Sequence, residues 1–197
     1  MTTYTHTQKK SSFIAILKRV TDEENALEIL QETKNSYPDA SHHCFAYIIG
    51  DHAFIQKASD DGEPSKTAGK PILDVLSKNN LTDIILIVIR YYGGTKLGAG
   101  GLIRAYSQSA RGAVDKSERI EKRTVMKATI TLTYPESADV GPYLNEHTTM
   151  IDEKYMSDVT YTFMFFKDDL DSIKKAIGAR TGYRSTPTII AEEKRYI

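Results

Sequence analysis

The sequence predicts an α+β protein of two small domains. In the second half of the chain, strand and helix patterns follow one another in the order β-α-β-β-α-β, the order of a ferredoxin-like unit. The length of 197 residues lies between one and two domains on the usual scale, and suffices to bury a core without disulfide or metal staples. A charged stretch at 116–122 looks like a linker, so we expect domains at 1–122 and 123–197.

The first half alternates strand and helix signals. The expected elements are strands at 12–17, 42–49, 53–57 and 84–89, and helices over 21–37, 71–79 and 102–114. Thr21 and Glu24 form a capping box that predicts the start of the first helix, and Pro38 ends it by moving the preceding residue out of the α region. The turn signal Gly50-Asp51 joins the second and third strands into a hairpin. The unbroken apolar run at 84–89 is typical of a strand covered on both faces.

The second half contains four strand signals and two helix signals. They are strands at 125–133, 150–155, 159–165 and from 188 to 190, and helices over 137–147 and 168–177. The strand at 159–165 alternates strictly between apolar and polar residues, which indicates one buried face. Asp168 and Asp169 suit a helix N-terminus, where negative charge is favourable. Gly141-Pro142 lies inside the other predicted helix.

Composition excludes several classes of protein. The single cysteine, Cys44, cannot form an internal disulfide, which fits a reducing compartment. Residues 1–10 are polar and lack the apolar run of a signal peptide, and the longest apolar run is far short of the ~20 residues of a membrane helix. We therefore expect a cytoplasmic protein with no membrane partner. Because 26 basic residues balance 26 acidic ones, any nucleic-acid binding must come from a local patch.

The first candidate cluster is His42-His43-Cys44, within a predicted strand. Successive side chains on a strand point to opposite faces, so the two histidines cannot easily share one metal. Cys44 is expected to be a buried apolar residue, with a Cys–His nucleophile as the alternative. His42 and His43 are candidate site residues, because imidazoles entering an apolar strand need partners.

The second candidate cluster is Asp60-Asp61-Gly62-Glu63. Three carboxylates within four residues repel one another unless a basic side chain, a metal or solvent neutralises them. Mg²⁺ would suit such oxygens, although the spacing does not match a calcium loop. Alternatively, Asp60 caps or turns the chain and Gly62 supplies a positive φ. The sequence leaves open whether the cluster binds a metal.

The third candidate cluster is a glycine-rich loop between the buried strand and a helix. Its members are Arg90, Tyr91, Gly93, Gly94, Lys96, Gly98, Gly100, Gly101, Arg104 and Arg111. Converging backbone N–H groups and the helix end favour an anion, and Lys96 and Arg104 add full charges. Tyr91, Tyr92 and Tyr106 would stack on bases. Alternatively, the glycines permit close strand–helix packing and the tyrosines fill the core; neither the Walker A nor the Rossmann pattern is complete.

Taken together, the three clusters resemble the IMPACT family over nearly the full chain. The resemblance rests on Ser41-His42-His43-Cys44-Phe45-Ala46-Tyr47, Asp60-Asp61-Gly62-Glu63-Pro64, Thr67-Ala68-Gly69-Lys70-Pro71-Ile72-Leu73, Arg90-Tyr91-Tyr92-Gly93-Gly94 and Leu97-Gly98-Ala99-Gly100-Gly101-Leu102. It implies a first domain with a ribosomal-protein-type βα fold of the small subunit, and a second, ferredoxin-like domain that resembles the last domain of elongation factor G. Eukaryotic relatives regulate translation, so the resemblance implies a translational role.

The sequence departs from the family pattern at Lys66, where bacterial members usually have glycine. A lysine there adds a charge beside Glu63 and removes backbone freedom. We expect either that Lys66 neutralises the acidic cluster or that a ligand loop is altered. An arginine often found near Ser11 and Ser12 is also missing.

Three functional hypotheses follow. The first is a translation-related regulatory protein that binds RNA or the ribosome without a cofactor, with Arg90, Lys96, Arg104 and Arg111 on phosphates. The second is a nucleotide-dependent enzyme similar to small-molecule kinases of this fold, with Mg²⁺ held by Asp60, Asp61 and Glu63. The third is a protein–protein interaction module. No acceptor site for a transferred phosphoryl group is evident, so the sequence favours a binding protein over an enzyme.

Overall fold

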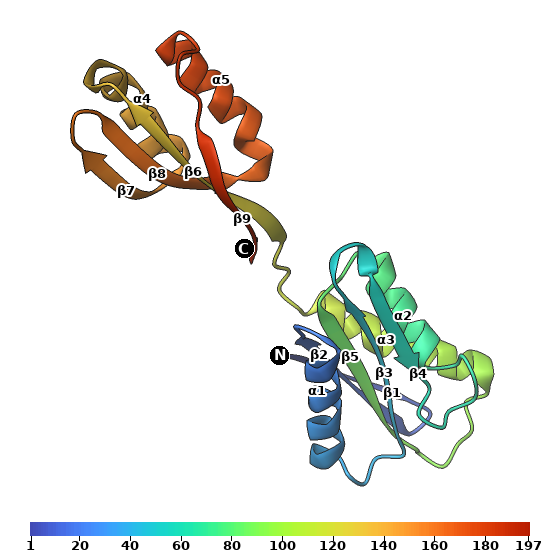
Figure 1. Cartoon of the computed structure of the whole chain (residues 1–197). Coiled ribbons are helices and arrows are strands. Elements are labelled where there is room, and N and C mark those ends of the chain that lie inside the picture. The colour runs from blue at the N-terminus through green and yellow to red at the C-terminus, as the bar shows by residue number, and fades with distance from the viewer. The chain divides into compact units, whose positions relative to one another are not determined.

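The computed structural model describes the backbone of residues 1–197 and every side chain except that of His52. It divides into two compact units, Met1–Glu118 and Arg119–Ile197, each built on one antiparallel sheet with helices (Figure 1). The predicted α+β class is confirmed.

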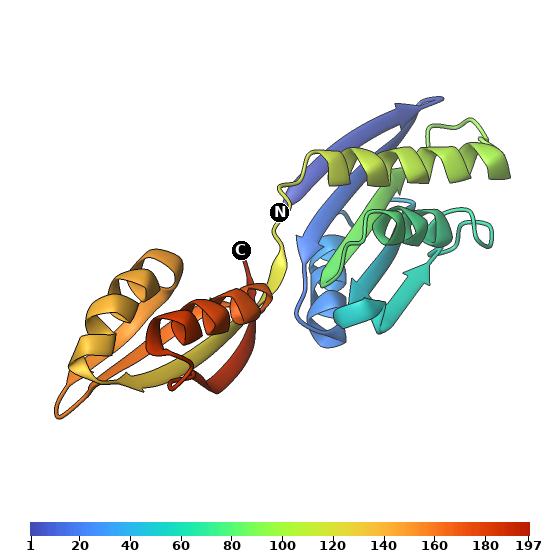
Figure 2. The same cartoon turned by 90° about the horizontal axis from the view of Figure 1, so that it is seen from above.

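The first unit has a five-stranded sheet in the order β1-β2-β5-β3-β4. Its strands are β1 (Thr2–Gln8), β2 (Ser11–Arg19), β3 (His42–Ile49), β4 (Ile55–Ser59) and β5 (Ile84–Tyr91), and its helices are α1 (Glu23–Ser36), α2 (Gly69–Lys78) and α3 (Ala99–Asp115). Helices α2 and α3 pack on one face of the sheet and α1 packs on the other (Figure 2). Strand β5 lies in the middle, and residues 85–89 are fully buried, as the apolar run predicted.

Two local features of this unit differ from the sequence-based expectations. Strand β1 was not expected, because its residues are polar; it forms by pairing with β2 along its whole length. The N-cap of α1 is Asp22 rather than Thr21, since the Asp22 carboxylate accepts the Asn25 N–H at 2.8 Å. The β3–β4 hairpin is confirmed, although its connection holds a short 3₁₀ turn, Asp51–Ala53, instead of a two-residue turn.

The second unit has a four-stranded sheet in the order β7-β8-β6-β9, the ferredoxin-like arrangement that the order of elements predicted. Its elements are β6 (Lys122–Leu132), α4 (Tyr134–His147), β7 (Thr149–Tyr155), β8 (Val159–Phe166), α5 (Leu170–Thr181) and β9 (Thr188–Tyr196). Both helices pack on one face (Figure 2), against the buried alternate residues of β8. Helix α4 starts earlier than expected because Thr133 and Glu136 form a capping box, and it accommodates Pro142.

Among the residues that the structure describes, no helix is long and apolar enough to cross a membrane.

Candidate functional site

A buried ion pair lies at the centre of the predicted site. Arg90, near the end of β5, donates to Glu63 Oε1 at 2.6 Å, and both side chains are almost completely buried. The Tyr106 hydroxyl on α3 donates to the same oxygen at 2.7 Å. Arg90 also lies between two rings, 5.5 Å from that of Phe13 and 5.4 Å from that of Tyr92. The cluster therefore joins β5, α3 and the loop after β4.

This placement corrects two roles expected from the sequence. The guanidinium of Arg90 is committed to Glu63 inside the domain, so Arg90 does not reach a phosphate in solvent. The Tyr106 ring is completely buried, so it does not stack on a base. Instead, Arg90 neutralises Glu63 and Tyr106 donates a hydrogen bond to it, because a buried carboxylate needs donors to compensate for its lost hydration.

Cys44 is completely buried beside this cluster, as expected for a small apolar residue. Its thiol lies 3.0 Å from the Asp60 carbonyl oxygen and 3.3 Å from the Tyr106 hydroxyl. Burial raises the pKa of the Cys44 thiol. The pKa of the Tyr106 hydroxyl is also raised, mainly by burial and to a smaller extent by the neighbouring Cys44 and Glu63. Cys44 therefore lacks the thiolate character that the alternative of a Cys–His nucleophile requires.

The two histidines point to opposite faces of β3, and the imidazole of each makes a hydrogen bond to a different neighbouring segment. His42 Nδ1 lies 2.8 Å from the Asp61 carbonyl oxygen, which fixes its N–H on Nδ1. His43 Nε2 lies 3.0 Å from the Tyr37 carbonyl oxygen, on the side of the sheet covered by α1. His42 Nε2 faces Glu63 at 4.0 Å and His43 is buried, so both imidazoles have structural partners.

Asp60 organises the start of α2. Its carboxylate accepts the backbone N–H groups of Lys66, Ala68 and Gly69 at 2.8 to 2.9 Å. Burial alone would raise the pKa of Asp60, but these backbone donors hold it below its usual range. The expectation that Asp60 caps or turns the chain is therefore confirmed.

The remaining carboxylate of the acidic cluster also has protein partners. Asp61 accepts the His43 N–H at 2.7 Å and pairs with Lys34 at 3.4 Å. Gly62 has a φ of +87°, as the turn alternative required. Across the part of the chain that the structure describes, no three His, Cys, Asp or Glu side chains lie close enough to hold one metal ion. The acidic cluster thus shapes its own loop.

The glycines of the third cluster are required, or tolerated, for different structural reasons. A Cβ on Gly93 would lie 2.0 Å from the Lys10 backbone, so this glycine allows the loop after β5 to pass close to the β1–β2 turn. Gly94 and Gly98 have φ of +82° and +72° with open space around them. Helix α3 starts at Ala99 rather than at 102, which places Gly100 and Gly101 in its first turn.

The other members of the third cluster separate into two groups. Lys96, Arg104 and Arg111 are exposed, and the Arg104 side chain lies along the first turn of α3, near Gly100. Tyr91 points to the other face of the sheet, where its hydroxyl donates to Asp39 at 3.0 Å. Tyr91 is thus separated from the cations of α3.

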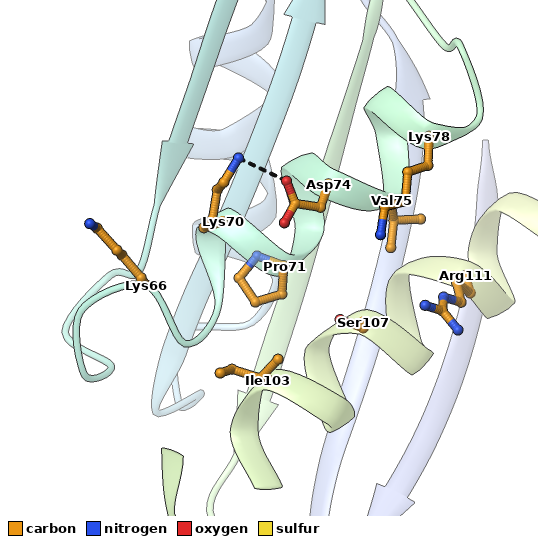
Figure 3. Close-up of a pocket in the computed structure, with 9 residues that line it drawn as sticks. All are labelled: Lys66, Lys70, Pro71, Asp74, Val75, Lys78, Ile103, Ser107 and Arg111. Carbon is orange, nitrogen blue, oxygen red and sulfur yellow. Dashed lines mark ion pairs between the residues drawn. The ribbon is translucent and has the colours of Figure 1, made fainter. Parts of the chain in front are cut away.

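A groove between α2 and α3 is lined by basic residues that lie far apart in the sequence. Its volume is about 300 Å³, and Figure 3 shows it with its lining residues, Lys66, Lys70, Pro71, Asp74, Val75, Lys78, Ile103, Ser107 and Arg111. Four cations and one carboxylate leave a formal charge of +3. The carboxylate, Asp74, is paired with Lys70 at 2.8 Å. Among the described side chains, Lys66, Lys78 and Arg111 have no ionic partner.

The sequence indicated only part of this groove. Arg111 and Lys66 were candidates, whereas Lys70 and Lys78 were not, because lysines on an exposed helix face usually belong to an ordinary solvated surface. The only indication in the sequence was that Lys70 and Lys78 are eight residues apart on one helix, which places their side chains about 80° apart around its axis. That α3 lies beside this face follows from the tertiary structure alone (Figure 3).

Lys66 sits in the left-handed region with a φ of +63°, where glycine is the least strained residue. This chain therefore has a lysine, where bacterial family members usually have glycine, at a position whose backbone conformation favours glycine. Its backbone N–H donates to Asp60, while its side chain lies at the margin of the groove and points away from Pro71 and Ile103 in Figure 3. Among the described side chains, Lys66 forms no ion pair with the carboxylates of the acidic cluster, so the expectation that it neutralises them is wrong; the expectation of an altered ligand loop stays a prediction.

Comparison with known proteins identifies relatives of both domains. A family model described as the Impact N-terminal domain matches residues 9–114. IMPACT family member YvyE from Bacillus subtilis (strain 168) is 41% identical over 150 residues, covering 76% of this chain and 69% of the relative. IMPACT family member YigZ from Escherichia coli (strain K12) is 35% identical over 140 residues, covering 70% of this chain and 69% of the relative.

One solved structure matches almost the whole chain. It is described as the crystal structure of an hypothetical protein and aligns with a TM-score of 0.60 at 27% identity. The alignment covers 96% of this chain and 94% of that one, so the similarity extends over both units.

Proposed function

The chain belongs to the IMPACT family, and we propose that its first domain binds RNA through the phosphate backbone, in a translation-related regulatory role. The observation that carries the proposal is the groove between α2 and α3, which is lined by four cations and one carboxylate. Phosphate contacts supply most of the affinity of non-specific RNA binding, and they need cations that are not already paired. Lys66, Lys78 and Arg111 meet that requirement among the described side chains.

The length of the groove favours a polyanion over a single phosphate group. Lys70 and Lys78 are eight residues apart on one helix, which corresponds to about 12 Å along its axis. Cations spread over that distance can contact several successive phosphates of a nucleic-acid strand. The exposed Lys96 and Arg104 add charge near the start of α3. Pro71, Val75 and Ile103 give the groove apolar lining that offers no side-chain hydrogen bonds to base edges.

The competing hypothesis of a magnesium-dependent enzyme assigned Asp60, Asp61 and Glu63 to a metal. Asp60 is occupied by three backbone N–H groups, and Glu63 by Arg90 and Tyr106. These contacts account for the carboxylates within the fold, so the geometry favours the binding function. A protein–protein module remains the alternative if RNA does not bind.

The proposal is tested by measuring the affinity for a short fluorescein-labelled RNA across a series of KCl concentrations. The variant Lys78→Gln/Arg111→Gln should bind more weakly, and its salt slope should fall by about 1 for each charge removed. The matched control is Lys174→Gln/Lys175→Gln, which removes two exposed charges from α5 in the second unit. Equal binding by wild type and the groove variant, or equal losses in both variants, would overturn the assignment to the groove.

Because the family resemblance implies a role in translation, we propose the ribosome as the RNA-containing partner. We expect the wild-type protein to sediment with ribosomes on a low-salt gradient and the groove variant to remain near the top. If wild type binds free RNA but stays away from ribosomes, the translational role fails while RNA binding stands. If neither binds and a pull-down returns a protein instead, the interaction-module alternative replaces the proposal.

A further inference from the structure

Tyr92 is a half-exposed aromatic residue at the first position after β5. Its side chain is 49% exposed, and its ring packs over the Arg90 guanidinium at 5.4 Å. The same guanidinium lies 5.5 Å from the ring of Phe13, which is fully buried. Two aromatic rings thus contact the Arg90 guanidinium, and Tyr92 is the exposed one.

Neighbouring residues hold Tyr92 in one position. The Tyr92 N–H donates to Ser41 Oγ at 3.2 Å, and Glu63 fixes Arg90 from the other side at 2.6 Å. A cation on one face of an aromatic ring is a favourable contact that restrains the ring. An exposed ring that is already ordered loses little conformational entropy when a flat group stacks on it.

The other two tyrosines once expected to stack on bases are engaged elsewhere. Tyr106 is fully buried with its hydroxyl on Glu63, and Tyr91 lies on the opposite face of the sheet with its hydroxyl on Asp39. Of these three tyrosines, Tyr92 alone presents a large exposed surface.

Tyr92 lies at the edge of the sheet from which the segments that line the groove begin. Strands β4 and β5 both run antiparallel to β3, so Tyr92 and the loop that holds Lys66 leave the same edge. Through Arg90, Tyr92 contacts Glu63, which lies three residues before Lys66 at one end of the groove. Along the chain it lies seven residues before the start of α3, whose Ile103 forms one wall of the groove. We expect a nucleic-acid strand that continues beyond this end of the groove to reach Tyr92.

We propose that Tyr92 is a nucleobase-stacking residue that receives an unpaired base of the RNA whose phosphates lie in the groove. The inference rests on the proposed function and adds the class of RNA to it. Base–aromatic stacking tolerates any base but requires one that is out of a duplex. The protein thus prefers single-stranded or looped RNA over a continuous duplex of equal charge.

The absence of tryptophan from the sequence allows a direct test. Tyr92→Trp introduces one tryptophan, whose fluorescence should be quenched when a single-stranded RNA binds and stacks on it. Inorganic polyphosphate should occupy the groove of the same variant with little quenching, because it carries charge without bases. Equal quenching by both ligands, or RNA binding with no quenching, would overturn the role of Tyr92.

A second set of variants measures the contribution to affinity. Tyr92→Leu should lower affinity for single-stranded RNA on the order of 10-fold and leave polyphosphate affinity unchanged. Tyr92→Phe should bind like wild type, since it keeps the ring. Phe54→Leu removes another exposed aromatic ring of the same unit and should have no effect. If wild type binds neither RNA nor polyphosphate, the groove proposal fails as well, whereas wild-type affinity in Tyr92→Leu overturns this inference alone.

Discussion

Arg90 and Glu63 form an ion pair of 2.6 Å in the interior of the first unit, although the sequence separates them by 27 residues. Both side chains would suit ligand binding if they were exposed. Paired with each other, they connect β5 to the loop that precedes α2. The cations available for a ligand line the groove between α2 and α3 instead. The conclusions about function depend on this division between buried and exposed charge.

Removing one partner of the pair should destabilise the first unit strongly. We expect Glu63→Gln and Arg90→Met each to lower the free energy of unfolding by about 3–5 kcal/mol, because each leaves a buried charge or donor without compensation. Urea denaturation followed by circular dichroism measures the effect. Combining the two changes should cost less than the sum of the single losses, and strict additivity would contradict a direct interaction.

Asp60 should make stability depend on pH. Because its pKa is lowered on folding from an ordinary value of 3.8, its stabilisation is complete above that value and is lost as pH falls through the folded pKa. Asp60→Asn should be less stable than wild type at neutral pH, and the difference should shrink in acid. Urea midpoints at neutral pH and below pH 3.8 test this prediction. A constant difference between the two proteins would contradict it.

Lys66→Gly should stabilise the fold while weakening RNA binding. Glycine relieves the left-handed backbone conformation, which for a residue with a Cβ costs about 1–2 kcal/mol. Lys66→Ala removes the same charge without that relief, so it serves as the matched control. Thermal unfolding should rank glycine above lysine and alanine, while both variants should show the same loss of RNA affinity. A melting temperature for the glycine variant equal to that of the alanine variant would remove the conformational argument.

Two glycine substitutions separate packing from ligand binding. Gly93→Ala should unfold or severely weaken the first unit, because the new Cβ would meet the Lys10 backbone at 2.0 Å. Gly100→Ala should instead raise stability by about 0.5–1 kcal/mol, since this position lies in the exposed first turn of α3 and meets only the Arg104 side chain. Both effects are read by urea denaturation. Loss of RNA binding in a stable Gly100→Ala protein would indicate that a phosphate approaches the backbone there.

Much of the fold could be predicted because hydrophobic periodicity is local. The buried run at 84–89 and the alternation at 159–165 marked the central strands of the two sheets. Strand β1 was not predicted because an edge strand can be polar on both faces and still pair through its backbone. The start of α3 was placed too late because glycines at 100 and 101 are typical of a loop, yet tertiary packing overrides that propensity.

By itself, the sequence determined the α+β class, the ferredoxin-like order of the second unit and the segments that contain the functional candidates. Residue identity and spacing along the chain suffice for those conclusions. Only the tertiary structure decided which charges meet: it buried Arg90 against Glu63, left Tyr92 exposed and brought Lys78 to the same groove as Arg111. Pairing and burial depend on distances between residues far apart in the sequence, and those distances set whether a charge neutralises its own fold or remains free to bind a ligand.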